Sequence, residues 1–289
     1  MKDFEYAAPT TLEDAVALLS RQEDQPRLLA GGTDIIVQLR EGLKEAGVVL
    51  DIKKIPELGE LSCDSSGLSL GAAVPCYRLY EDAEIVAGYG ALTDAAHIIG
   101  GWQIQTRASI GGNLCNSSPA ADGIPPLIVH DATCHITGPK GSRTVPVAEF
   151  CTGPGKNVLQ PGELLVKLTL PAPGAKSGSA YLRFIPRNEM DIAVAGVGAS
   201  VKLSADGKTI ESGRIAAGAV APTPKYCAEA SEFLAGKPAN EEIFAAAGEL
   251  AKKVATPIND MRGTIEYRVH LVEVLTKRAL AIAVERARG

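Results

Sequence analysis

Two segments of the chain each place a Gly-Gly pair beside small polar residues. The first, residues 30–34, reads Ala-Gly-Gly-Thr-Asp, and the second, residues 109–113, reads Ser-Ile-Gly-Gly-Asn. Glycine has no Cβ to block a close approach and it allows positive φ, so successive N–H groups can turn toward one anion. A single Gly-Gly pair is more often an ordinary tight turn. Two pairs of one type make an ordinary turn less expected without excluding it, and a pyrophosphate is the natural ligand of such segments.

The motifs of several other sites are missing from the sequence. Neither segment fits G-x-G-x-x-G, and no G-x-x-x-x-G-K-[ST] occurs, which disfavours a Rossmann site and a P-loop. There is no G-x-S-x-G or H-E-x-x-H either, and the histidines lie far apart. The remaining inventory consists of small polar groups that suit phosphate oxygens and ribose hydroxyls: Thr33, Asp34, Ser109, Asn113, Ser117 and Asp122. A flavin dinucleotide fits, because the cofactor carries the reactivity, although composition alone does not select a flavin.

Composition and charge are those of an ordinary globular protein. The 289 residues are 46% hydrophobic and 22% charged, and this length favours roughly two domains of about 100–200 residues. A net charge of −5 without any Lys/Arg run longer than two argues against nucleic-acid binding. We find neither a signal peptide nor an apolar window that could span a membrane, so we expect a cytoplasmic protein. The six cysteines form no C-x-x-C pair that would suggest zinc or an iron–sulfur cluster.

The first Gly-Gly segment is predicted to lie between a strand and a helix. Residues 27–30 form a short buried strand in this prediction, and a helix begins at Asp34 and ends at Gly42 or Gly47. An amphipathic helix precedes them over residues 11–21. Further strands are predicted over residues 48–52 and 68–74.

The second segment is predicted as a loop that follows a helical region. Apolar spacing predicts helix over residues 77–100, and Gly100-Gly101 ends it. After the segment come a polar turn and a short helix that opens at Asp122. A hairpin of residues 133–137 and 143–147 and a strand over 163–170 are predicted next.

Residues 171–179 are the clearest linker, and we place the domain boundary there. Beyond it the pattern predicts three strands followed by three helices, which indicates a small α+β domain. The strands are predicted over residues 180–185, 191–203 and 213–220, and the helices near 226–235, 240–254 and 262–287.

Taken together, the motifs resemble the FAD-binding medium subunit of the molybdenum hydroxylases, the family that includes xanthine dehydrogenase and aerobic carbon monoxide dehydrogenase. Both Gly-Gly segments match the FAD loops of that family. Further matches run in family order over nearly the whole chain, at residues 118–122, 158–163, 191–193, 218–224 and 266–268.

The resemblance implies an α+β fold in two domains. A two-part FAD-binding domain of the PCMH-like type covers residues 1–172, with subdomains of about 1–55 and 56–172. A small C-terminal α+β domain, a three-stranded antiparallel sheet plus helices, covers residues 180–289.

The resemblance also implies which residues line the cofactor. The first segment contributes Leu29, Ala30, Gly31, Gly32, Thr33, Asp34 and Ile35, and the opposing wall contains Thr106, Ser109, Ile110, Gly111, Gly112 and Asn113. Asp122 would meet the ribose, and Gly100, Leu165 and Arg183 would lie by the flavin. For Leu165 a plain core role is an equal alternative, and for Arg183 a surface salt bridge is. A Gly111→Val side chain is expected to obstruct the diphosphate.

In such enzymes the flavin subunit delivers electrons to an acceptor, and this is the role that the resemblance implies here. A large molybdenum subunit with the molybdenum cofactor and a small subunit with two [2Fe-2S] clusters are the expected partners, as a dimer of heterotrimers. The acceptor is NAD, quinone, oxygen or another protein. The chain lacks the cysteine-rich insertion that holds an extra iron–sulfur cluster in relatives that reduce aromatic thioesters. It has no histidine placed for covalent flavin attachment, so non-covalent FAD is expected. The alternatives are a stand-alone flavoprotein oxidoreductase and a non-catalytic assembly subunit.

Overall fold

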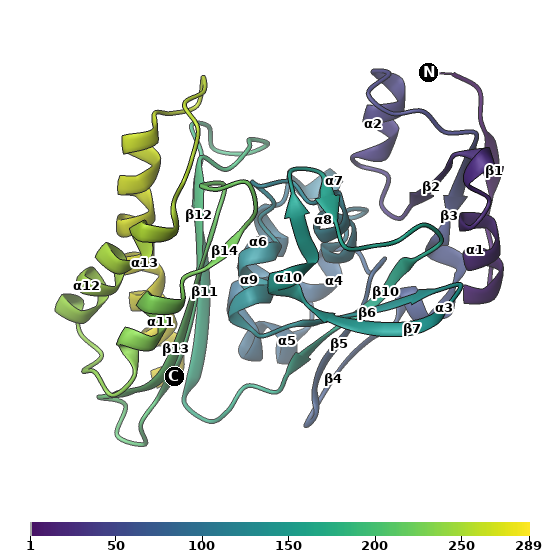
Figure 1. The fold of residues 1–289 in the computed structure, drawn as a ribbon. Coiled ribbons are helices and arrows are strands. Elements are labelled where there is room, and N and C mark those ends of the chain that lie inside the picture. The colour runs from purple at the N-terminus through teal and green to yellow at the C-terminus, as the bar shows by residue number, and fades with distance from the viewer. Residues whose placement is uncertain (1) are drawn as a thin grey trace.

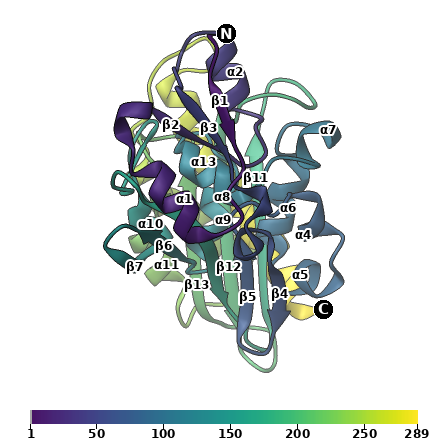
Figure 2. The same cartoon turned by 90° about the vertical axis from the view of Figure 1, so that its right-hand side faces the viewer.

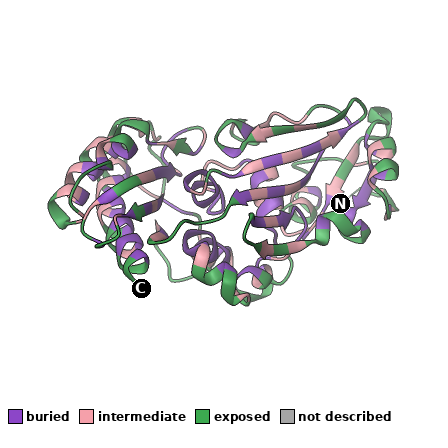
Figure 3. Cartoon of the chain, turned by 90° about the horizontal axis from the view of Figure 1, so that it is seen from below, coloured by how far each residue is buried: buried purple, intermediate pink, exposed green. Residues whose placement is uncertain are grey.

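The computed structural model describes residues 2–289, and it has three lobes arranged in chain order (Figure 1). We name them the N-terminal lobe (residues 2–60), the middle lobe (61–171) and the C-terminal lobe (177–289). Each lobe has a sheet of its own, and Figure 2 shows the N-terminal lobe in front of the other two. Buried positions follow the inner faces of the elements, and exposed positions follow the outer turns and helix faces (Figure 3).

The N-terminal lobe is built on a small parallel sheet with the strand order β1-β3-β2. The central strand β3 (Val48–Asp51) is buried at every position, as expected for a strand with a neighbour on each side. The first Gly-Gly segment lies between β2 and α2, as predicted. The remaining elements are β1 (Glu5–Ala7), α1 (Leu12–Leu19), β2 (Pro26–Leu29), α2 (Ile35–Arg40) and α3 (Pro56–Gly59), with 3₁₀ turns at Gln22–Asp24 and Ile52–Lys54.

The middle lobe has a five-stranded antiparallel sheet with the order β4-β5-β10-β6-β7. The predicted hairpin is confirmed as β6 (Thr133–Gly138) and β7 (Gly141–Pro146). The predicted strand over 68–74 ends early, because the chain leaves the sheet after β5 (Gly67–Gly71). The edge strand β4 (Leu61–Asp64) was missed, since its few half-buried residues carry too short a pattern. Strand β10 (Leu164–Pro171) completes this sheet, and β8 (Cys151–Gly153) pairs with β9 (Lys156–Asn157) in a separate two-stranded sheet.

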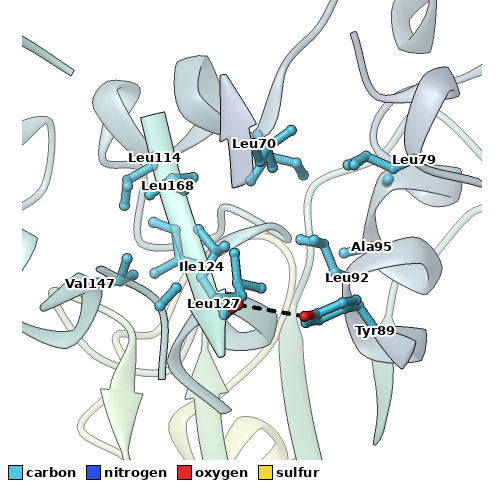
Figure 4. Close-up of a cluster of buried hydrophobic side chains, with 14 of the residues drawn as sticks. Leu70, Leu79, Tyr89, Leu92, Ala95, Leu114, Ile124, Leu127, Val147 and Leu168 are labelled. Atoms are coloured by element: carbon cyan, nitrogen blue, oxygen red, sulfur yellow. Dashed lines mark hydrogen bonds between the residues drawn. The ribbon is translucent and has the colours of Figure 1, made fainter. Parts of the chain in front are cut away.

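The predicted helix over residues 77–100 is wrong in one respect, because it is three short helices. The Asp82 carboxylate caps the second helix by accepting hydrogen bonds from the N–H groups of Glu84 and Ile85. A new helix therefore begins there, although the apolar spacing of the sequence continues. Their buried faces meet the sheet in the core of the lobe, where the Tyr89 hydroxyl donates to a backbone oxygen (Figure 4). The helices of the lobe are α4 (Tyr77–Tyr80), α5 (Ala83–Gly88), α6 (Gly90–Ile98), α7 (Trp102–Gln105), α8 (Ile110–Asn116), α9 (Ile124–Val129) and α10 (Val147–Phe150).

The C-terminal lobe has an antiparallel sheet in which the three predicted strands are joined by a fourth, β14 (Lys225–Tyr226). Two residues are too few for a sequence pattern, and the strand forms because the chain returns along β13. The linker is shorter than predicted, since β11 already begins at Ser177. The elements are β11 (Ser177–Phe184), β12 (Ala195–Leu203), β13 (Ile210–Gly218), α11 (Ala228–Leu234), α12 (Glu241–Ala251), a 3₁₀ turn at Lys252–Val254 and α13 (Ile265–Arg288).

Helices cover both faces of the C-terminal sheet, and they come from two lobes. Helices α11 and α13 pack on one face, whereas α6 and α9 of the middle lobe pack on the other (Figure 1). Close contact is possible because small residues occur at the junction: a Cβ on Gly198 would lie 3.1 Å from the backbone of Pro125. The C-terminal lobe is therefore fixed directly against the middle lobe. Within residues 2–289 no helix is both long and apolar enough to cross a membrane.

Candidate functional site

A cavity of about 630 Å³ lies where the lobes meet, a volume within the range of small-molecule and cofactor sites. Its walls come from the first Gly-Gly segment, from the start of α8 and from loops of the middle and C-terminal lobes. Most of the residues predicted for the site are brought together here: Ala30, Gly31, Gly32, Thr33, Asp34, Ile35, Gly100, Ser109, Gly111, Gly112, Asn113, Asp122, Leu165 and Arg183. Leu165 also belongs to the core of the middle lobe, so its two predicted roles coexist.

Three predicted residues do not line the cavity. Leu29 and Ile110 are buried in hydrophobic clusters behind the two segments, because each follows the apolar side of its element. Thr106 is exposed, and its hydroxyl donates to the backbone oxygen of Gln103, which closes the end of α7. Leu29 and Ile110 therefore support the walls from behind, whereas Thr106 lies on the surface.

The first Gly-Gly segment is a true loop whose two glycines meet different needs. A Cβ on Gly31 would lie 2.2 Å from the backbone oxygen of Arg107, so the close approach of the two walls requires glycine. Gly32 adopts a φ of +81°, which favours glycine for conformational reasons. Two side chains hold the start of the segment: the Arg107 guanidinium donates to the Gly31 oxygen, and Lys53 donates to the Ala30 oxygen.

The second segment is the first turn of a helix, so its prediction as a loop is wrong. Ser109 is the N-cap of α8, and its Oγ accepts a hydrogen bond of 3.0 Å from the Gly112 N–H. A Cβ on Gly111 would lie 2.4 Å from the backbone oxygen of Ala72, so this glycine lets α8 sit against the middle sheet. A Gly111→Val side chain would therefore meet Ala72, and the expectation that it obstructs a diphosphate directly is corrected.

Gly112 is the position in this turn where a side chain would enter open space. Its Cβ would contact only the Ser109 Oγ, at 3.0 Å, and the residue lines the cavity. Glycine here leaves room for a group that contacts the helix start. A helix start presents free N–H groups and the positive end of a dipole, which suits phosphate. α2 also begins at this cavity, after Asp34.

Asn113 connects the second segment to the next turn of the chain. Its side-chain oxygen accepts a hydrogen bond of 3.0 Å from the Gly123 N–H. This bond fixes the turn that carries Asp122, so part of the polar inventory has a supporting role.

Asp122 and Arg183 form a buried ion pair at the junction of the middle and C-terminal lobes. The guanidinium Nη1 lies 2.6 Å from one carboxylate oxygen, and the Tyr181 hydroxyl donates to the other at 2.8 Å. Burial raises the pKa of Asp122, while Arg183 and Tyr181 oppose that shift. The Arg183 side chain is only 7% exposed, so the alternative of a surface salt bridge is wrong. Each carboxylate oxygen of Asp122 already has a partner, and a contact with ribose stays a prediction.

A polar bridge between the N-terminal and middle lobes was missed by sequence reasoning. Gln38 donates to the Asn116 side chain at 3.2 Å, and Asn116 donates in turn to Asp34 at 3.4 Å. All three residues line the cavity. One signal was present, because Gln38 follows Asp34 by one helical turn and must point to the same side.

Other lining residues come from two motifs that match the family in sequence but contribute no residue to the predicted site. They belong to the 158–163 and 191–193 motifs: Leu159, Gln160, Gly162, Glu163, Asp191 and Ile192. No periodicity indicates that these loops reach the Gly-Gly segments, which only tertiary contact decides.

The chemistry of the cavity is that of a binding site. Burial raises the pKa of the Cys115 thiol to about 12, so this lining residue is a poor nucleophile. Within residues 2–289 no histidine lines the cavity and no acidic or thiol cluster could hold a metal ion. The donors and open space around the helix starts fit an anionic molecule.

Comparisons with known proteins match this chain over nearly its whole length. The FAD binding domain in molybdopterin dehydrogenase matches residues 2–173, and the CO dehydrogenase flavoprotein C-terminal domain matches residues 180–283. The putative xanthine dehydrogenase FAD-binding subunit XdhB of Escherichia coli K12 is 36% identical, over 100% of this chain and 99% of its own length.

Solved structures have the same fold. A chain of carbon monoxide dehydrogenase from Hydrogenophaga pseudoflava superposes with a TM-score of 0.93 at 32% identity, covering 99% of this chain and 98% of the other. A chain of quinoline 2-oxidoreductase from Pseudomonas putida 86 gives 0.91 at 27% identity, with all of both chains covered.

Proposed function

The chain belongs to the FAD-binding subunits of the molybdenum hydroxylase family, and we propose that it holds FAD non-covalently in the cavity between its lobes, as an electron relay. FAD supplies the redox chemistry, by which electrons from the iron–sulfur clusters of a partner subunit reach an external acceptor. The proposal also takes residues 1–172 and 180–289 as the two domains.

The observation that carries this proposal is the convergence of the two Gly-Gly segments on one cavity. Gly31 allows the walls to approach, and Gly112 leaves the start of α8 open. The N–H groups near Thr33 and at the start of α8 would hold the diphosphate. Gly100, Leu165 and Arg183 line the same cavity and would lie beside the flavin ring.

The relay role is favoured over turnover by this subunit alone because, within residues 2–289, three of the four carboxylates that line the cavity are held in ion pairs, and the fourth, Asp34, accepts a hydrogen bond from Asn116. The carboxylates of Asp122, Glu163 and Asp191 are each bound to an arginine. We infer that partner subunits supply the substrate chemistry: a large subunit with the molybdenum cofactor and a small one with two [2Fe-2S] clusters, in a dimer of heterotrimers. NAD, quinone, oxygen or another protein would be the acceptor.

Flavin content of the purified complex tests cofactor binding. We expect acid to release FAD from the wild-type complex. Gly112→Val should reduce the FAD content severely while the complex stays assembled, because its side chain enters the open cradle. Gly59→Val is the matched control, since a Cβ there meets nothing within 4 Å and Gly59 lies outside the cavity. A wild-type complex without flavin would contradict the proposal and favour an assembly subunit.

Reoxidation of the reduced complex tests the relay. The complex is first reduced with dithionite, and NAD, a quinone or oxygen is then added. With the acceptor that works best, the iron–sulfur absorbance of the wild type should recover quickly. Recovery should be slow in Gly112→Val and normal in Gly59→Val. Equal rates in all three complexes would rule out electron transfer through this site. Substrate turnover by the isolated chain would favour the stand-alone oxidoreductase instead.

A further inference from the structure

The cavity contains more positive than negative charge at its N-terminal end, once its internal ion pairs are accounted for. Among its lining carboxylates, three have arginine partners within 2.6–3.2 Å: Asp122 with Arg183, Glu163 with Arg143, and Asp191 with Arg187. The charged lining residues that remain are Arg27, Lys44 and Asp34. Two cations therefore face one carboxylate.

Neither of these cations has an ion-pair partner within residues 2–289. The Arg27 Nε donates to the backbone oxygen of Glu45, which leaves the terminal nitrogens of the guanidinium without a protein acceptor. The Lys44 ammonium group has no hydrogen-bond acceptor in that part of the chain. Asp34 instead accepts from Asn116, at 3.4 Å. Arg27 and Lys44 are both exposed and line the cavity, so their charges are free to meet an anionic ligand there.

The local fold brings the two cations to the same end of the cavity. Arg27 lies in β2, the strand that precedes the first Gly-Gly segment. Lys44 lies beyond the end of α2, the helix that follows that segment. The N–H groups of Leu43 and Lys44 both donate to the Gln38 oxygen, which turns the chain back at the end of α2. Partial burial and then the repulsion of Arg27 lower the pKa of Lys44, whereas the Asp34 carboxylate opposes that shift, so the three charges lie near one another.

We propose that Arg27 and Lys44 bind the diphosphate of FAD and select FAD over flavins without a diphosphate. The inference rests on the proposed function. Backbone N–H groups of the two Gly-Gly segments can orient the diphosphate, but they carry only partial positive charge. The diphosphate carries one full negative charge on each of its two phosphate groups. The two side chains supply the missing charge, and Arg can do so with two N–H groups at once.

Flavin titrations of the full-length chain, freed of flavin, test this assignment. Arg27→Gln and Lys44→Gln should each weaken FAD binding about tenfold, the usual effect of losing a charged hydrogen bond. Riboflavin has no phosphate, so its affinity should stay within twofold of wild type in both variants. Lys54→Gln is the control, because Lys54 is exposed on the same lobe and lies outside the cavity.

Two further measurements separate a charge effect from a structural one. Arg27→Lys should retain most of the FAD affinity because it keeps the positive charge. Salt should weaken FAD binding less in the double variant than in the wild type, since fewer charged contacts remain to be screened. Unchanged FAD affinity in both Gln variants, or an equal loss for riboflavin, would overturn this inference alone. A wild-type chain that binds no FAD would overturn it together with the proposed function.

Discussion

The two Gly-Gly segments have nearly the same sequence pattern but different structures. The first is a loop between β2 and α2, and the second is the capped first turn of α8. Gly32 needs its positive φ, whereas Gly111 and Gly112 are helical residues. In both segments one glycine permits a close backbone contact: Gly31 with Arg107, and Gly111 with Ala72.

This difference shows that a repeated motif need not mean a repeated conformation. In each segment one glycine permits a close backbone contact. Of the other two, Gly112 faces the cavity and Gly32 gives the loop its conformation. The four positions should therefore differ in how much a side chain costs in folding and in FAD binding. Substitutions can rank them, and the four predictions below run from the largest expected effect to the smallest.

Gly111→Val should have the largest effect on stability. Its Cβ would lie 2.4 Å from the backbone oxygen of Ala72, and backbone cannot move aside as a side chain can. We expect a loss of at least ~3 kcal/mol in the free energy of unfolding, or no folded protein. Denaturant unfolding measures it. FAD bound with normal affinity in a stable variant would show that α8 is placed wrongly.

Gly31→Ala should cost less, about 2 kcal/mol, because a single methyl group has to be accommodated. Its Cβ would lie 2.2 Å from the Arg107 oxygen, so the loop must move away from the second wall. The hydrogen bond from the Arg107 side chain would be lost as well. FAD affinity should fall together with stability. A change in neither quantity would contradict the close contact between the walls.

Gly32→Ala should cost roughly 1–2 kcal/mol through its backbone conformation. The φ of +81° would strain alanine, and its Cβ would meet a flexible atom of Ile36 at 3.1 Å. Gly32→Asn is the matched comparison, because asparagine tolerates the left-handed region better. Thermal unfolding should place Asn between glycine and alanine, and the opposite order would refute a conformational cause.

Gly112→Ala should change the stability of the flavin-free chain by less than about 0.5 kcal/mol. A gain in helix propensity opposes the tight contact of its Cβ with the Ser109 Oγ. Its effect should appear with the cofactor present. Saturating FAD at a hundredfold excess over Kd should stabilise the wild type by about 2.7 kcal/mol, and this increment should shrink in the variant. An undiminished increment would place the ligand elsewhere.

Local sequence determined the elements around the site and the kinds of residue in it. The Thr11 cap of α1 and the β6–β7 hairpin follow from patterns of a few residues, which act wherever the chain folds. The order of motifs was enough to indicate the family, and most of the residues predicted from it line the cavity. The apolar spacing of residues 77–100 was followed too far, because one Asp cap outweighs it.

Tertiary structure alone decided how the residues of the site divide between binding and support. Asp122 could serve ribose or an ion pair, and the arrival of Arg183 from another lobe settles its partner in the protein. The same holds for Arg27 and Lys44, whose significance depends on carboxylates that pair elsewhere. Sequence specifies what each residue can do within a few neighbours. Which lobes meet, and therefore which charges remain unpaired, depends on contacts between residues far apart in the chain.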